Sequence, residues 1–88
     1  MAQTYNIDID ERDDEMGFFP AEQSIAVGDT VVWTNRMGFA HTASALGGAF
    51  DSKNIEAGKT FSHTFTAAGN VPYRCNIHTD MKGVIKVA

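Results

Sequence analysis

Short runs of alternating apolar and polar residues extend along most of the chain, and they constrain its fold more than any other feature. β-Branched and aromatic residues occupy every second position in these runs, and glycine-containing turns separate them. A period of two is typical of strands with one buried face, whereas an amphipathic helix needs a period near 3.6. The sequence therefore predicts an all-β fold. The predicted strands cover residues 4–10, 24–27, 30–35, 60–66, 71–75 and 83–87.

The alternation also predicts which side chains are buried. In the 30–35 run, Val31 and Trp33 share a face, and we expect them at the centre of the core. In the 60–66 run, His63 lies between Phe61 and Phe65 on one face. This position predicts a hydrogen-bonded structural histidine, with an exposed edge histidine and a metal ligand as the alternatives. The residues from 42 to 57 show no clear period, and we expect short strands and a loop there.

Length, composition and charge exclude several classes of function. The 88 residues, of which 43% are hydrophobic and 20% charged, predict one globular domain that covers residues 1–88. No apolar run is long enough to span a bilayer, so we expect no stable membrane insertion. The formal net charge is -4, and Lys and Arg do not cluster, which argues against a nucleic-acid partner.

The only cysteine of the chain belongs to a short motif. Cys75, His78 and Met81 form Cys-x-x-His-x-x-Met. With the histidine and methionine content of this chain, both offsets would be filled by chance about once in 650 cases. A thiolate and neutral imidazoles suit zinc or copper, but a thioether adds little for zinc and suits copper. The motif therefore predicts three ligands of a copper ion, and a lone cysteine excludes an intramolecular disulfide.

A second histidine is needed to complete this site. Two histidines and one cysteine in a trigonal arrangement, with a long axial methionine, are typical of blue-copper electron-transfer centres. His41 and His63 are the candidates. His41 follows a glycine-containing turn after the Trp33 strand, and the ends of such strands can meet at one end of an antiparallel sandwich. We therefore predict His41 as the fourth ligand, with a surface-loop histidine as the alternative.

The succession of motifs resembles the cupredoxins, and within them the plastocyanin and amicyanin group. The resemblance covers nearly the whole chain apart from the acidic segment and residues 45–56. It rests on Phe19-Pro20, Ile25 through Asn35, Gly38-Phe39-Ala40-His41, Gly58-Lys59-Thr60-Phe61 and Gly69 through Tyr73-x-Cys75-x-x-His78-x-x-Met81-x-Gly83.

This resemblance implies an eight-stranded Greek-key β-sandwich with one type 1 copper near one end. By residue, it implies His41, Cys75 and His78 as equatorial ligands and Met81 as the axial ligand. The expected function is electron transfer by a non-enzymatic carrier that cycles between Cu(I) and Cu(II). A copper chaperone or store, an excised domain of a larger copper enzyme and a metal-free structural sandwich are the alternatives.

The expected partners are donor and acceptor redox proteins, which we expect to dock on a monomer. An apolar patch of Gly38, Phe39, Ala40 and Ile77 around His78 is the predicted docking surface, with ordinary packing as the alternative.

The carboxylates are unevenly distributed. Six of the eleven lie between Asp8 and Glu15, interrupted only by Ile9 and Arg12. We expect a solvated loop there, or else a patch that steers a basic redox partner.

Two further expectations concern the neighbours of the ligands and the start of the chain. Thr42 and Asn76 stand where relatives commonly have Asn and Ser or Thr, so we expect these two to exchange roles in the hydrogen bond between the ligand loops.

The chain begins without the basic and apolar regions of a signal peptide. We expect a periplasmic or otherwise extracytoplasmic protein whose leader is absent from this chain, with a cytosolic protein as the alternative.

Overall fold

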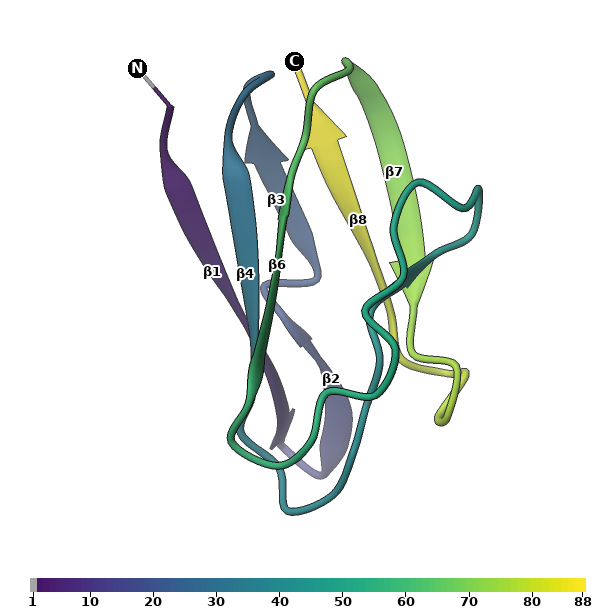
Figure 1. The fold of residues 1–88 in the computed structure, drawn as a ribbon. Helices are drawn as coiled ribbons and strands as arrows, with labels where there is room; N and C mark the ends of the chain where they lie inside the picture. The colour runs from purple at the N-terminus through teal and green to yellow at the C-terminus, as the bar shows by residue number, and fades with distance from the viewer. Residues whose placement is uncertain (1) are drawn as a thin grey trace.

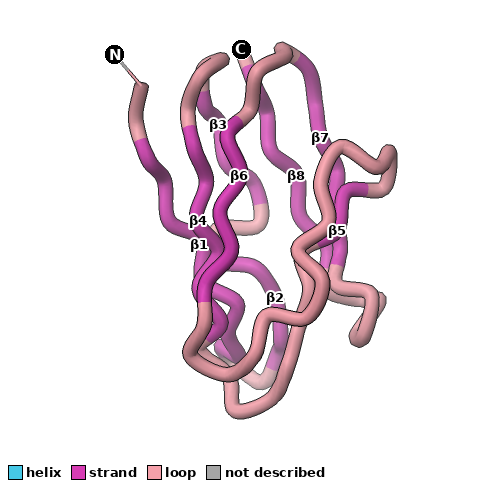
Figure 2. The backbone as a smooth tube through the Cα atoms, viewed as in Figure 1, coloured by secondary structure: helices cyan, strands magenta, loops and turns pink. Residues whose placement is uncertain are grey.

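The computed structural model describes residues 2–88, which form eight β-strands and no helix (Figures 1 and 2). The strands are β1 (Thr4–Arg12), β2 (Glu15–Phe19), β3 (Glu22–Ile25), β4 (Thr30–Asn35), β5 (Ser44–Ala45), β6 (Thr60–Thr64), β7 (Gly69–Arg74) and β8 (Lys82–Val87). They form two four-stranded sheets, in the orders β2-β1-β4-β6 and β3-β8-β7-β5. The two sheets pack against each other around one apolar core. The predicted all-β sandwich of about eight strands is confirmed.

The first sheet joins strands that lie far apart in the sequence. β1 pairs with β4 in parallel, so that Tyr5 lies opposite Val31 and Ile7 lies opposite Trp33. Because side chains alternate along a strand, this register puts the apolar residues of both strands on the inner face. The observed bounds of β4 agree with the predicted run 30–35.

An aromatic cluster fills the space between the sheets. Trp33 is fully buried, and its ring centroid lies 5.1 Å from that of Phe50, 5.7 Å from that of Phe61 and 5.3 Å from that of Tyr73. Trp33 belongs to the first sheet and Tyr73 to the second, so this contact holds the sheets together. Gly83 lies opposite Tyr73 on β8, where an added Cβ would come within 2.6 Å of the phenol ring. Only glycine leaves room for Tyr73 at this position.

The acidic segment is a β-hairpin, so the predicted loop was wrong, although residues 11–15 are exposed to solvent as expected. β1 continues to Arg12, β2 begins at Glu15, and Asp13 and Asp14 form the two-residue turn between them with φ angles of 52° and 64°. Left-handed backbone at both positions is typical of a type I′ turn, for which aspartate is well suited. The Arg12 guanidinium contacts Asp8 at 2.9 Å, which offsets part of the negative charge.

His63 lies on β6, as expected, but its surroundings are aromatic. The half-buried ring lies 5.2 Å from Phe50 and 4.8 Å from Phe65 between ring centroids. Within residues 2–88 the His63 ring forms no hydrogen bond, so the prediction that this histidine is hydrogen-bonded was wrong. Burial lowers the pKa of His63, which favours the neutral imidazole expected of a packed ring.

The segment between β4 and β6 is mostly loop, interrupted by the two residues of β5 (Figure 2). β4 and β7 belong to different sheets but finish at the same end of the sandwich, opposite the two chain termini (Figure 1). The connections that follow these two strands carry all four predicted ligands. Among the residues that the structure describes, no helix is long and apolar enough to cross a membrane.

Candidate metal centre

Three of the predicted ligands converge at the end of the sandwich away from the termini. His41 lies in the connection after β4, and Cys75 and His78 lie in the loop between β7 and β8. One ligand atom from each of these residues lies within 4.8 Å of the other two. The Cys75 Sγ and His41 Nδ1 atoms are 3.6 Å apart. The structure therefore brings the His41 imidazole next to Cys75, 34 positions away in the sequence, and next to the His78 imidazole.

Asn35, the last residue of β4, shapes the connection that presents His41. Its buried side-chain amide donates hydrogen bonds to the carbonyl oxygens of Phe39 (2.9 Å) and Ile55 (2.8 Å), and its Oδ1 atom accepts one from the Met37 N–H (2.9 Å). The backbone of His41 exchanges hydrogen bonds of 3.2 and 2.7 Å with Ile55. These bonds fix the backbone on both sides of the His41 ring.

The loop from Cys75 to Met81 is closed by its own backbone. The Cys75 N–H donates to the Met81 carbonyl at 3.0 Å, and the Met81 N–H donates to the His78 carbonyl at 3.0 Å. The Cys75 Sγ atom accepts two N–H groups, from Thr42 at 3.3 Å and from His78 at 3.4 Å. These two N–H groups hold the Cys75 sulfur in a fixed position between the loops.

Burial favours the neutral form of the His41 imidazole. His41 is fully buried, and its burial, with a smaller effect from the neighbouring His78, lowers its pKa. The neutral imidazole is the form that binds metals. The buried Nδ1 atom of His78 has no hydrogen-bond partner among the described residues, a costly condition that a metal ion would relieve.

The donor set fits a single copper ion. Ligand distances near 2.0 Å for nitrogen and about 2.3 Å for sulfur, at trigonal angles, separate two donors by about 3.7 Å. The Cys75 Sγ and His41 Nδ1 atoms lie close to this distance, at 3.6 Å. Met81 is also buried, at 2% exposure, and lines the same cleft as His78. Its thioether is the soft donor that distinguishes a copper site from a zinc site.

The sequence profile of the copper binding proteins of the plastocyanin/azurin family matches residues 4–88. The chain belongs to this family. It is 32% identical over 78 residues to the amicyanin of Paracoccus denitrificans, covering 83% of this chain and 60% of that protein. It is 30% identical over 94 residues to the chloroplastic plastocyanin of Physcomitrium patens, covering 86% of this chain and 53% of that protein. The chain thus spans less than two thirds of the length of these two relatives.

Solved structures agree with this membership. A purple cupredoxin from Nitrosopumilus maritimus superposes on this chain with a TM-score of 0.85 at 26% identity, covering 96% of this chain and 99% of that one. The predicted resemblance to plastocyanin and amicyanin is confirmed.

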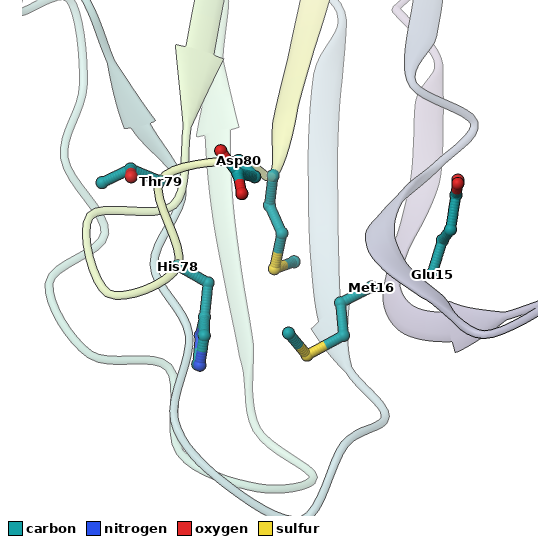
Figure 3. Close-up of a pocket in the computed structure, with 6 residues that line it drawn as sticks. Glu15, Met16, His78, Thr79 and Asp80 are labelled. Carbon is teal, nitrogen blue, oxygen red and sulfur yellow. The ribbon is translucent and has the colours of Figure 1, made fainter.

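A cleft borders the His78 side of the centre. It is lined by Glu15 and Met16 of β2 and by His78, Thr79, Asp80 and Met81 of the ligand loop. Figure 3 shows the Met16 side chain directed towards the region that the His78 ring also faces. The start of the second strand of the acidic hairpin therefore adjoins the ligand loop, which the sequence did not reveal.

Thr42 and Asn76 do connect the two ligand loops, in part as expected. The Asn76 backbone N–H donates to the Thr42 hydroxyl at 2.8 Å. The Asn76 side chain instead donates to the Ser44 hydroxyl at 3.0 Å, and the Thr42 and Ser44 hydroxyl oxygens lie 3.1 Å apart. Ser44 is thus a third member of the connection, and sequence reasoning missed it because residues 42–57 have no period from which to place it.

Proposed function

We propose that this protein is a one-electron carrier in which His41, Cys75, His78 and Met81 would hold one type 1 copper ion. The single observation that carries the proposal is the convergence of the three donor atoms within 4.8 Å in a family of copper-binding proteins. Copper bound there would supply a reversible Cu(I)/Cu(II) step. The electron-transfer activity of amicyanin and plastocyanin supports the same role here.

The protein's contribution to such a step is rigidity. Electron transfer is fast when the ligands keep nearly the same positions in both oxidation states, so the site must resist rearrangement. His41 is held by its backbone bonds to Ile55, and Cys75 is held by its bond to Met81. The N–H groups of Thr42 and His78 stabilise the thiolate of Cys75 in place. The His78 ring, only partly buried, provides the path for the electron to the surface.

An apolar patch around His78 is the proposed docking surface for redox partner proteins. Phe39 and Ile77 are large apolar side chains that stay 50% and 47% exposed. The Phe39 ring lies 5.7 Å from the His78 ring between centroids. A small exposed apolar surface next to a ligand allows brief, water-excluding contact. We propose that a monomer uses this surface in a periplasmic or otherwise extracytoplasmic compartment.

The first test is the visible spectrum and cyclic voltammogram of the copper-loaded protein. A strong sulfur-to-copper charge-transfer band and a reversible one-electron couple are expected. Met81→Gln should keep the copper and lower the reduction potential, because an oxygen donor stabilises Cu(II) more than a thioether does. Rapid copper release without a reversible couple would instead support a chaperone or store, and a colourless metal-loaded protein would support zinc.

The docking surface is tested by electron self-exchange between two copies of the protein, measured by NMR line broadening. Replacing both Phe39 and Ile77 with serine should slow self-exchange while leaving the visible spectrum unchanged. Leu46→Ser is the matched control, since Leu46 is 59% exposed and is not part of the patch around His78. An unaltered rate in the double variant would contradict docking at this surface.

A further inference from the structure

A chain of hydrogen bonds runs from both ligand loops to a carboxylate at the surface. The Ser44 hydroxyl contacts the Asp51 Oδ1 atom at 3.1 Å, in addition to its contacts with Thr42 at 3.1 Å and with the Asn76 amide at 3.0 Å. The Asn76 N–H reaches Thr42 at 2.8 Å. We call these four residues the Asp51 network.

The chemistry of the groups determines where each proton lies. A carboxylate only accepts, so the Ser44 hydroxyl must donate to Asp51. The Ser44 oxygen then accepts from both the Asn76 amide and the Thr42 hydroxyl, and the Thr42 oxygen accepts from the Asn76 N–H. The hydrogen bonds therefore lead from Asn76 and Thr42 to Ser44, and from Ser44 to Asp51. Hydrogen bonds aligned in this way polarise and strengthen one another.

Thr42 and Ser44 are both buried, at 4% and 6% exposure, whereas Asp51 is exposed. Buried hydroxyls without partners are costly, so their bonds to one another and to Asp51 are needed at this position. Asp51 is itself fixed, because its Oδ1 atom also accepts the Lys53 N–H at 2.9 Å. The hydrogen bond from the Lys53 N–H lowers the pKa of Asp51 most, and the bond from the Ser44 hydroxyl lowers it further. Asp51 is therefore ionised at neutral pH.

The segment that supplies Asp51 is attached to the strand next to the ligands. The Ser52 N–H donates to the Ala43 carbonyl at 3.0 Å, and the Ser52 hydroxyl accepts the Ala43 N–H at 2.8 Å. A β-bridge also joins Ser44 to Asp51. Asp51 therefore has a defined place relative to His41 and Thr42.

We propose that Asp51 is a positioning residue of the metal centre, which acts through Ser44 to hold both ligand loops in register. This inference rests on the proposed copper site. Asp51 touches no ligand atom. Its effect passes through Thr42, whose N–H group is one of the two donors to the Cys75 sulfur.

The effect on the metal has a predicted sign. Hydrogen bonds to the cysteine sulfur withdraw charge from the thiolate, which favours Cu(I) and raises the reduction potential. Loosening Thr42 should therefore lower the potential. Removing the charge of Asp51 acts in the opposite direction, because a nearby anion favours Cu(II). Since Asp51 is exposed and screened by solvent, that direct effect is the smaller one.

Four variants separate positioning from charge and from simple loss of stability. Asp51→Asn removes the charge but keeps an oxygen that accepts from Ser44, whereas Asp51→Ala removes both. Ser44→Ala breaks the network and leaves the charge of Asp51 in place. Ser52→Ala is the structural control, because it weakens the attachment of the same segment without touching the network.

We expect Ser44→Ala and Asp51→Ala to lower the copper affinity about tenfold, which is the usual size of such indirect effects, and to lower the reduction potential. Asp51→Asn should restore the affinity and leave the potential at or slightly above the wild-type value. Ser52→Ala should reduce thermal stability without moving the charge-transfer band or the potential. Equal values for Asp51→Ala and Asp51→Asn, or a wild-type affinity and potential in Ser44→Ala, would overturn the inference.

The metal-free protein provides an independent readout. Amide hydrogen exchange at Asn76 should be faster in Asp51→Ala than in Asp51→Asn, because the network holds its N–H against Thr42. If the wild-type protein shows no charge-transfer band, the proposed function fails while this exchange comparison still tests the network. If the band is present and exchange at Asn76 is unaffected by either substitution, only the role of Asp51 is rejected.

Discussion

The aromatic core and the metal-binding end of this protein are both buried, but they are held together in different ways. Around Trp33, the contacts are between rings of the two sheets. Around Cys75, hydrogen bonds within and between the loops reach its sulfur and join its neighbours. Apolar contact is non-directional, whereas a hydrogen bond weakens steeply when its geometry changes. The core therefore determines whether the chain folds, and the loops determine where the ligands lie.

This division has a consequence for substitutions. Changes in the core should alter the free energy of unfolding, and changes at the metal-binding end should alter copper properties while the fold persists. The two regions meet at Tyr73 and Gly83, since Tyr73 packs on Trp33 and lies two residues before Cys75.

The largest effect is expected from Cys75→Ser. Loss of the thiolate should abolish the charge-transfer band and the redox couple, because no other residue can supply a sulfur anion. The metal-free variant should retain the far-ultraviolet circular dichroism of the wild type. An unchanged visible spectrum would contradict the assignment of Cys75, and an unfolded variant would contradict the division between core and metal-binding end.

Trp33→Ala should have the largest effect on folding. Removing a fully buried indole leaves a cavity, which typically costs about 3–5 kcal/mol of unfolding free energy. Urea denaturation of the metal-free protein measures this loss. Val27→Ala is the matched control, because Val27 is 48% exposed and its truncation should change stability by less than about 0.5 kcal/mol. If Trp33→Ala does not fold, Trp33→Phe gives a smaller loss in the same direction.

Gly83→Ala tests the junction of the two regions. The new methyl group would lie 2.6 Å from Tyr73 Cζ, and overpacking of this kind costs about 1–3 kcal/mol. Because Tyr73 precedes Cys75 by two residues, the copper band should also shift. Gly17→Ala provides the control, since its methyl group would meet only ordinary contacts at 3.6 Å. Equal stabilities of the two variants would show that the phenol can move aside freely.

The smallest effect is expected at alkaline pH. Burial raises the pKa of Tyr73 far above its ordinary value. The nearby Trp33 indole offsets this only in part, because its N–H group and the Tyr73 hydroxyl do not reach hydrogen-bonding geometry. Unfolded Tyr73 ionises near pH 10 while the folded form stays protonated, so stability should fall as the pH rises above about 10. Tyr73→Phe should remove this contribution. Denaturation midpoints from pH 8 to pH 11 that fall equally in both proteins would contradict it.

Local patterns predicted much of the fold. The strand at 30–35 and the inward positions of Val31 and Trp33 follow from a period of two, which each strand displays without reference to its neighbours. The hairpin at Asp13 and Asp14 was missed because the density of charge suggested a solvated loop. Its signal was present, since two aspartates between strand-like runs are compatible with a type I′ turn. Ser44 and Asp51 carried no comparable signal.

The sequence alone determined the β-class of the protein and predicted three ligands in its Cys-x-x-His-x-x-Met motif, because strand alternation and ligand spacing are properties of short segments. The sequence predicted His41 rather than His63 for this site, but only the tertiary structure shows how closely the His41 ring lies to Cys75. It alone connected Asp51 to the ligand loops. These relations depend on two sheets packing so that β4 and β7 end together, which is a long-range consequence of burying the shared core.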